Sequence, residues 1–206
     1  MKINNTDVYG LWSSVFASGY PKNLTISGER DRDLYESHLI IAEKLFSTTP
    51  GSGHDCAAKG IIVQTDITAP QYFWLQWERY HFHDTISSQS TMHMITKMDL
   101  DEMCNEYVFK ETKEHLKQLV KTYNFSKEGS LAKKMTFQEI ISNIPEGLEL
   151  TRRVTTNYLQ LKTIYTQRKN HKLLEWREIF CPWVLELPFF QELMQRHDKG
   201  EENAKD

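Results

Sequence analysis

The sequence has few cysteines and no long apolar run, and these absences exclude several kinds of protein. Its three cysteines, Cys56, Cys104 and Cys181, are an odd number at long spacings, with no CxxC pair. A disulfide framework or a thiolate zinc site is therefore not expected, and the thiols should be reduced. No run of 18 apolar residues occurs, and the N-terminal sequence lacks the charged-then-apolar order of a signal peptide. We therefore expect a cytoplasmic protein without membrane contact.

A basic excess is also missing. Among 206 residues, 25 Lys and Arg are outnumbered by 28 Asp and Glu, and the formal net charge is -3. A general nucleic-acid-binding protein would usually carry the opposite imbalance, so no nucleic-acid partner is expected. With 39% hydrophobic residues the chain can bury a core. We expect one domain over residues 1–196 and a disordered tail over 197–206, where the charged sequence HDKGEENAKD stands.

Helical and extended patterns alternate along the chain. Apolar spacing predicts helices over 29–46, 101–123, 136–141 and 157–168, a helix from Pro70 onward, and a helix over 171–196 interrupted near Pro182 and Pro188. Branched residues predict strands over 60–68 and 148–156, with a short third strand over 92–96. This interleaving predicts an α+β fold, with a mixed sheet flanked by long helices.

Polar side chains are concentrated between Gln76 and Ser90, in the sequence QWERYHFHDTISSQS. On a helix beginning near Pro70, four of them would share one face: Gln76, Arg79, Tyr80 and His83. This pattern fits an ordinary amphipathic helix with a solvated arginine. It also fits an aromatic-walled cleft that ends at Arg79, because a guanidinium binds phosphate or a carbonyl ring through two parallel hydrogen bonds. Residues 87–90 would then line its floor.

A second candidate region lies between residues 150 and 174, which contain six Lys or Arg and no Asp or Glu. The segment is too short for a nucleic-acid track, so a small anion is the more economical partner. Asn157 and Arg168 are eleven residues apart, close to three helical turns, and would project from the same side of a helix that Asn157 caps. Arg168 at a helix C-terminus could equally serve the helix dipole.

Other catalytic signatures are weak or absent. Four histidines and one acid invite a metal interpretation, but no HExxH and no favourably spaced third ligand occurs, so no metal is expected. Neither GxSxG nor the phosphate loop GxxxxGK is present, and a nucleophilic mechanism is not indicated. The histidines and the acid in question are His54, His81, His83, His93 and Asp84.

Several segments together resemble the flavin-dependent thymidylate synthases, from about Glu29 to Pro182. The landmarks follow the order of that family: ERDRDL, then Gly53-His54, a strand, Ala69-Pro70, Gln76-Trp77 and Arg79, with Pro145 twelve residues before Asn157 and Arg168 eleven after it. The family signature RHRxxSxNExSxRY corresponds here to RYHFHDTISSQSTMH. The resemblance therefore rests on order and spacing, while the signature itself is altered.

The alterations replace charged groups by neutral ones. In the signature, Arg79 and Ser90 match, whereas Tyr80, His81, Ser87, Ser88, Met92 and His93 stand at positions of other residues; later, Leu159 and Thr163 replace an arginine and an asparagine. A charge-assisted hydrogen bond contributes about 1.5–3 kcal/mol against about 1 for a neutral one, so such losses weaken binding of an anion. The cations that could compensate are Lys162, Arg152 and Arg153.

The resemblance implies a homotetramer that binds FAD and methylates a pyrimidine deoxynucleotide. NADPH would reduce the flavin, and methylenetetrahydrofolate would donate the carbon unit to C5 of dUMP, giving dTMP. It further implies catalytic roles for Arg168 and Arg79, flavin contacts by His54, Arg79, His81 and Asn157, and nucleotide contacts by Gln76, Ser88, Gln89, Ser90 and Arg168. The alternative is a catalytically inactive nucleotide-binding protein on the same scaffold, because the second arginine and the Asn-Glu pair are missing.

Overall fold

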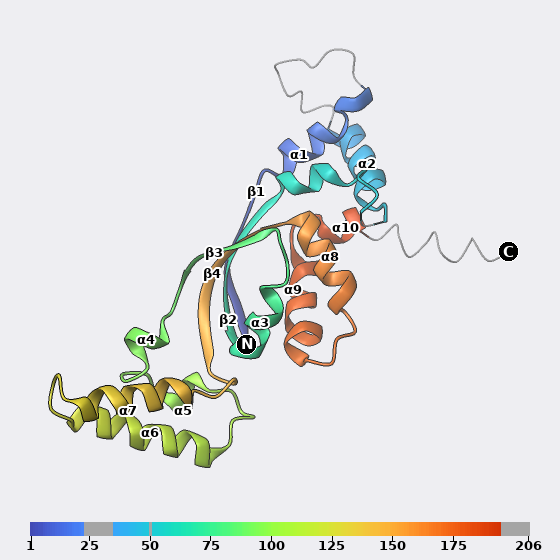
Figure 1. Cartoon of the computed structure of the whole chain (residues 1–206). Coiled ribbons are helices and arrows are strands. Elements are labelled where there is room, and N and C mark those ends of the chain that lie inside the picture. Colours follow the sequence, from blue (N-terminus) through green and yellow to red (C-terminus); the bar gives the residue numbers. More distant parts are fainter. Residues whose placement is uncertain (23–34, 50, 195–206) are drawn as a thin grey trace. The chain divides into compact units, whose positions relative to one another are not determined.

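The computed structural model describes residues 1–22, 35–49 and 51–194. The expected tail over 197–206 and the first part of the helix expected from Glu29 lie outside these residues. The described chain forms a four-stranded sheet together with many helices, which confirms the expected α+β class (Figure 1). Among the helices in these three ranges, none is long and apolar enough to cross a membrane.

The strands lie in the order β1-β2-β4-β3. They are β1 (Lys2–Tyr9), β2 (Ile62–Pro70), β3 (His83–Ser88) and β4 (Glu149–Asn157). Thr68 Oγ1 lies 2.8 Å from Thr151 Oγ1. Toward the other end of β2, the N–H of Tyr158 donates to the carbonyl of Ile61 at 3.0 Å, so β2 and β4 are antiparallel. The strands expected over 60–68 and 148–156 are therefore confirmed to within two residues.

The chain divides into two compact units, and each strand contributes residues to both. The first unit comprises Met1–Asn4, Asp66–Tyr80 and Thr85–Arg153, and the second comprises Asn5–Thr65, His81–Asp84 and Val154–Asp206.

The first unit carries five helices among its described residues. They are α3 (Gln71–Trp77), α4 (Thr91–Met94), α5 (Leu100–Met103), α6 (Lys110–Phe125) and α7 (Leu131–Ser142). Helices α6 and α7 run side by side and are joined by a tight turn at Gly129 (Figure 1). Ser130 caps α7, because its Oγ accepts the N–H of Lys133 at 3.2 Å.

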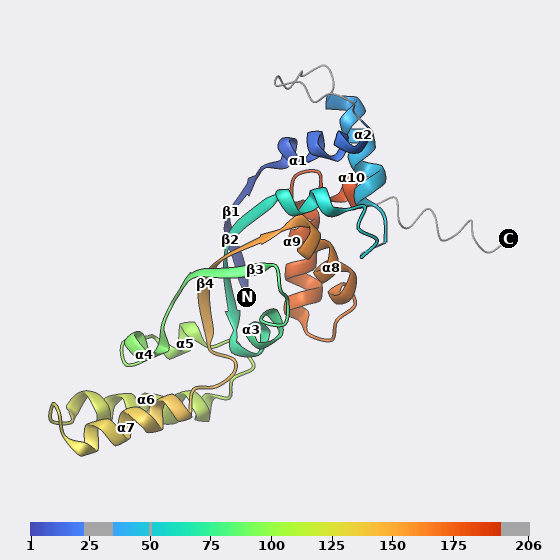
Figure 2. The same ribbon diagram turned by 45° about the horizontal axis from the view of Figure 1, so that its top comes forward.

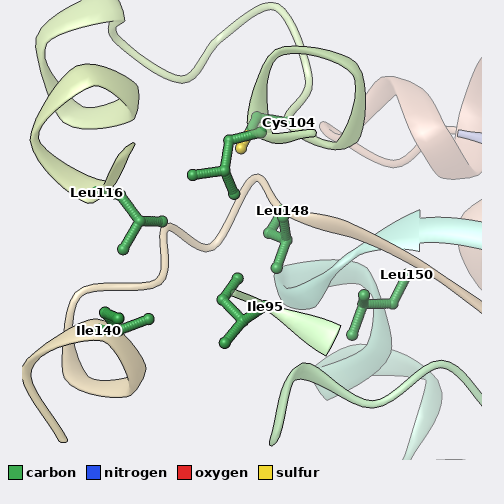
Figure 3. Packing of buried hydrophobic residues seen from close by; sticks show 7 residues of the cluster. Ile95, Cys104, Leu116, Ile140, Leu148 and Leu150 are labelled. Atoms are coloured by element: carbon green, nitrogen blue, oxygen red, sulfur yellow. The ribbon is translucent and has the colours of Figure 1, made fainter. Parts of the chain in front are cut away.

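One hydrophobic cluster joins α5, α6, α7 and the end of α4 to β4 (Figure 3). Its members are Ile95, Leu100, Cys104, Leu116, Ile140, Leu148 and Leu150, each less than 8% exposed. Fully burying an aliphatic side chain contributes about 1.5–3 kcal/mol, so this cluster supplies a core for residues 95–150. Ile95 belongs to it as the residue that ends α4, and the strand expected over 92–96 is therefore wrong. The cluster also explains why the single helix expected over 101–123 is divided, since Cys104 leaves α5 to pair with Leu148 in an antiparallel bridge.

The second unit is built from helical segments that precede β2 and follow β4 in the sequence. They are α1 (Leu11–Ser18), η1 (Tyr20–Lys22), α2 (Tyr35–Phe46), η3 (Cys56–Gly60), α8 (Tyr158–Arg168), η4 (Glu175–Phe180), α9 (Cys181–Glu186) and α10 (Phe190–Met194). α1 packs against α2, and α8 against α9 (Figure 2). Pro182 stands in the first turn of α9 and Pro188 between α9 and α10, so the predicted interruptions are confirmed.

The connection from β1 to α1 depends on Gly10. Its φ of +73° is one that side-chain-bearing residues rarely adopt, and a Cβ atom there would lie 2.4 Å from the carbonyl oxygen of Gly60. Glycine at this position therefore allows β1 to turn into α1 directly beside η3. Neither β1 nor α1 was predicted, because the sequence KINNTDVY is mostly polar and forms an edge strand without an alternating apolar face.

Candidate functional site

The predicted site residues are divided between the two units. Gln76, Arg79, Ser88, Gln89 and Ser90 belong to the first unit, and His54, His81, Asn157 and Arg168 to the second. The approach of Arg79 and Arg168 to one ligand therefore stays a prediction.

Helix α3 begins after Pro70, as predicted, but ends too early to carry the expected polar face. Trp74 and Trp77 are fully buried, and the N–H of Tyr80 donates to the carbonyl of Trp77 at 3.0 Å, which closes the helix with a turn. His83 opens β3 instead of continuing the helix. The proposed common helical face of Gln76, Arg79, Tyr80 and His83 is therefore wrong. Arg79 projects from the turn that follows α3, outside the regular helix.

The hydroxyl-rich segment after Arg79 is mostly strand. β3 includes Ser87 and Ser88, and both side chains are exposed on a strand at the edge of the sheet. Gln89 is bonded to β4 through two contacts: its N–H donates to the carbonyl of Thr151 at 3.0 Å, and its Oε1 accepts the N–H of Thr151 at 2.9 Å. Ser90 is the N-cap residue of α4. Gln89 therefore orders the segment, and the serines supply the exposed hydroxyl groups.

Two arginines of β4 are held by acids of the first unit. Arg152 Nη1 lies 2.7 Å from Glu78 Oε1, and its Cζ lies 4.4 Å from the centroid of the Trp74 ring. This arrangement combines an ion pair with a cation–π contact at the end of α3. Arg153 Nη1 lies 3.4 Å from Asp66 Oδ1. The sequence suggested both as compensating cations, but each already has an acidic partner.

The third suggested cation, Lys162, is buried. Its side chain is 3% exposed, and its Nζ donates to the carbonyls of Phe46 and Thr48 at 2.6 and 2.5 Å and to Asp55 Oδ2 at 2.8 Å. All three protons of the ammonium group have acceptors, so Lys162 joins α8 to the end of α2 and to the loop before η3. It is not a ligand for an external anion, and this expectation is corrected.

Asn157 caps α8, as predicted. Its Oδ1 accepts the N–H of Gln160 at 2.9 Å, and the residue is 8% exposed. Gln160 is also buried, and its Oε1 accepts the N–H of Phe82 at 3.2 Å. The first turn of α8 thus fixes the backbone next to His81, which is exposed. This role of Gln160 was not predicted, because only the folded chain shows that the glutamine is buried.

Arg168 ends α8, eleven residues beyond Asn157. Its Cζ lies 5.0 Å from the centroid of Trp176, a fully buried ring in the π-helical turn η4. Burial, together with Arg168 and Lys172, lowers the pKa of His171 from its ordinary value. Burial also raises the pKa of Cys181 to about 11, against the influence of Arg168. Trp176 therefore provides a flat platform for the Arg168 guanidinium, a role that the sequence did not indicate.

Asn157 and Arg168 cannot both contact one small ring. At a rise of about 1.5 Å per residue, the eleven residues that separate them span roughly 16 Å of helix. Leu161 and Ile164, between them, are fully buried. That Asn157 and Arg168 share one side of the helix stays a prediction. A ligand that contacts both residues must be extended, as a dinucleotide is, or two ligands must lie along α8.

His54 lies on the exposed turn before η3, directly after Gly53 with φ of +81°. It lines a cavity of about 620 Å³ together with residues of α1 and α2. Cavities of roughly 300–1,000 Å³ are the usual size for small-molecule sites. Among the residues that the structure describes, no group of three or more His, Cys, Asp or Glu side chains is arranged to hold a metal ion.

The fold is similar to that of solved flavin-dependent thymidylate synthases. ThyX from Helicobacter pylori, complexed with FAD and dUMP, superposes with a TM-score of 0.66 over 93% of this chain and 96% of that chain, at 12% sequence identity. A second crystal structure of Helicobacter pylori ThyX with FAD and dUMP gives a TM-score of 0.68 over 96% and 99%, also at 12% identity. No protein-family model matches the sequence, and no curated protein matches it. At this identity the likeness establishes a ThyX-like fold over nearly the whole chain.

Proposed function

We propose that the chain is an FAD-dependent enzyme that methylates a pyrimidine deoxynucleotide, with dUMP to dTMP as its reaction. The observation that supports this most directly is the ThyX-like fold, which covers 93–96% of the chain in comparisons with two ThyX structures solved with FAD and dUMP. The retained order of Gly53-His54, Gln76-Trp77, Arg79, Asn157 and Arg168 agrees with that fold.

The donor set of the chain suits such ligands. FAD, reduced by NADPH, would supply a hydride while methylenetetrahydrofolate supplies the one-carbon unit. The task of the protein is then to hold flat rings in register and to polarise the pyrimidine, which needs oriented cations and neutral donors but no protein nucleophile. These groups are provided by Arg79 and Arg168, by an exposed histidine beside a cavity and by exposed serines on β3. We assign His54, Arg79, His81 and Asn157 to the flavin, and Gln76, Ser88, Gln89, Ser90 and Arg168 to the nucleotide.

Arg168 is the residue that we expect to act most directly on the pyrimidine. Its guanidinium is half-buried and rests on the Trp176 ring, so its direction is restrained before a ligand arrives. A restrained, permanently charged group stabilises developing negative charge on a ring carbonyl at little reorganisation cost. Arg79, on the turn after α3, is the second cation in this assignment.

The visible spectrum of the purified protein and release of tritium from C5-labelled dUMP test this proposal. A protein that takes up FAD and releases tritium in the presence of NADPH and methylenetetrahydrofolate supports it. A colourless protein that does neither would rule it out. Product analysis by mass spectrometry separates methylation from hydroxymethylation of the same carbon.

Three further expectations stay predictions: a homotetramer, a cytoplasmic location and a single domain over 1–196. Sedimentation analysis tests the homotetramer, and cell fractionation tests the location.

A catalytically inactive nucleotide-binding protein on the same scaffold is the second candidate. It is favoured by one structural observation: Arg152, Arg153 and Lys162, the cations that could replace the missing charged ligands, already have acidic partners. Calorimetry distinguishes the two functions. Tight dUMP binding without flavin supports the second, whereas flavin-dependent turnover excludes it.

A further inference from the structure

The turn that joins α6 to α7 and the helix ends beside it, residues 121–135, form the hairpin tip of the first unit (Figure 1). Three large apolar side chains of this tip are exposed: Phe125 to 89%, Leu131 to 72% and Met135 to 57%. Phe125 is the last residue of α6, and Leu131 and Met135 share one face of α7 because they are four residues apart. Single exposed apolar residues are ordinary, whereas a group of them at one turn indicates an interaction site.

The packing of α6 against α7 does not use these three side chains. Leu116 and Ile140 are buried between the helices and β4, and the ring centroids of Tyr123 and Phe137 lie 5.6 Å apart. The hairpin is therefore stabilised by its inner face. Apolar surface that stays in water is unfavourable, so the exposed side chains at the tip gain free energy only when something outside this hairpin covers them.

The charge of the hairpin tip is opposite to that of the whole chain. Residues 121–135 contain four Lys and one Glu, in a chain with a formal net charge of -3. The single acid, Glu128, has its Oε2 2.8 Å from Lys133 Nζ, so these two charges offset each other. The other three lysines are exposed: Lys121, Lys127 and Lys134. The tip therefore fits a surface that is both anionic and able to receive apolar side chains.

We propose that the hairpin tip docks on an anionic lipid surface, with Phe125, Leu131 and Met135 entering the interface and the lysines at the headgroups. Segments that lie on a membrane combine apolar side chains with lysines in this way, and each lysine near an anionic leaflet strengthens the attraction. The long lysine stems let the ammonium groups reach the headgroups. The expectation of no membrane contact rested on the lack of a spanning segment, and a surface-bound tip needs none.

The composition of the tip favours lipid over a protein or a nucleic acid. Lysine is depleted at the centres of protein interfaces, whereas here it accompanies every exposed apolar side chain. Surfaces that bind single-stranded nucleic acid place aromatic rings beside cations so that bases can stack. Leu131 and Met135 have no ring for stacking. A lipid interface accepts aliphatic side chains without requiring a matching shape.

Co-sedimentation of the full-length chain with lipid vesicles tests the proposal. One set of vesicles consists of phosphatidylcholine alone, and the other contains about a quarter phosphatidylserine. We expect binding to the anionic vesicles to be at least about tenfold tighter, and to weaken strongly at about 1 M salt, where charges are screened within roughly 3 Å. No binding to either set, or equal binding to both, would overturn the proposal.

Two substitutions at the tip separate the apolar part from the charged part. Phe125→Ser should reduce the partition coefficient by about tenfold or more, and Lys127→Gln by about fivefold. The matched controls are Phe109→Ser and Lys110→Gln, because both residues are exposed at the opposite end of α6. Circular dichroism checks that each variant is folded. Equal losses in the tip variants and the controls would contradict docking through the tip.

Two other results would assign the tip to a different occupant and overturn the proposal. One is binding of a single-stranded oligonucleotide, lost in Phe125→Ser, by a protein that ignores vesicles. The other is self-association of the chain that Phe125→Ser abolishes in sedimentation. FAD uptake and tritium release should be the same in Phe125→Ser as in the wild type, since residues 121–135 include none of the assigned site residues. Vesicle binding and turnover are thus measured separately, and either proposal can fail alone.

Discussion

The guanidinium of Arg168 rests on the ring of Trp176, with 5.0 Å between Cζ and the ring centroid. Trp176 is fully buried in a π-helical turn, a distortion that recurs at functional sites. A cation–π contact of this kind contributes about 0.5–2 kcal/mol and, more importantly here, restricts the direction of the guanidinium. The orientation of Arg168 therefore depends on a residue eight positions further along the chain.

Trp176→Phe should weaken dUMP binding by about 0.5–1 kcal/mol, because phenylalanine attracts a cation less than tryptophan does. Calorimetry with dUMP gives the affinity, and urea unfolding shows whether the variant is folded. Trp183→Phe is the control, since Trp183 belongs to α9 and donates to Thr6 Oγ1 at 3.2 Å. Unchanged dUMP affinity in a folded Trp176→Phe protein would show that the platform does not serve binding.

Arg168→Ala should reduce nucleotide binding by at least about 1.5–3 kcal/mol, the contribution of one charged hydrogen bond, and leave the fold intact. Arg168→Lys keeps the charge but loses the planar fork, so it should recover only part of the affinity. Lys169→Ala, at the exposed neighbouring position, should bind like the wild type. The measurement is dUMP titration followed by calorimetry, with circular dichroism to check the fold.

His54→Ala should weaken flavin more than nucleotide. The histidine is exposed at a cavity in the second unit, so its removal leaves the core unchanged. Equilibrium dialysis with FAD and calorimetry with dUMP give the two dissociation constants. If the constant for dUMP rises more than that for FAD, the assignment of His54 is wrong. His38→Ala is a poor control because that ring contacts buried Phe16, whereas exposed His93 on α4 gives a suitable one.

Lys162→Met should destabilise the protein by about 3–5 kcal/mol, because it leaves the carboxylate of Asp55 buried without its cation. The double variant Lys162→Met with Asp55→Leu should recover much of this loss, since apolar replacement of a whole buried pair is often neutral. Urea unfolding measures both. Lys117→Met removes an exposed pair with Asp101 and should leave the free energy of unfolding nearly unchanged. Equal effects of Lys162→Met and Lys117→Met would contradict the burial argument.

His171 should make the protein less stable in acid. Its pKa in the folded state is lowered from 6.5 by burial and by the nearby Arg168 and Lys172, and its Nδ1 accepts the N–H of Leu173 at 3.2 Å. The unfolded chain therefore binds the proton more readily, and stability falls as the pH drops from about 6.5 toward the lowered folded-state pKa. His171→Asn should lose this part of the pH dependence in urea unfolding followed from pH 8 to pH 5. An unchanged slope would mean that His171 protonates equally in both states.

Local patterns predicted much of the fold. Alternation in β2, the cap at Asn157 and the interruptions at Pro182 and Pro188 depend on neighbouring residues, and the structure confirms all of them. The segment 92–96 did not follow its local pattern. Ile95 was expected in a strand but enters a core shared with α6, α7 and β4, and burial there outweighs a weak extended preference.

The candidate site shows the same contrast between local sequence patterns and tertiary contacts. Residue types and spacing selected Arg168 and Arg79 as ligand-binding candidates, because a guanidinium group has specific chemistry wherever it stands. The family resemblance added His54. Spacing could not reveal that Lys162 is buried against Asp55, that Arg152 is held by Glu78 and Trp74, or that Trp176 supports Arg168. These contacts join residues up to 107 positions apart in the chain. Only the folded chain brings these residues together, because their contacts depend on how distant segments pack.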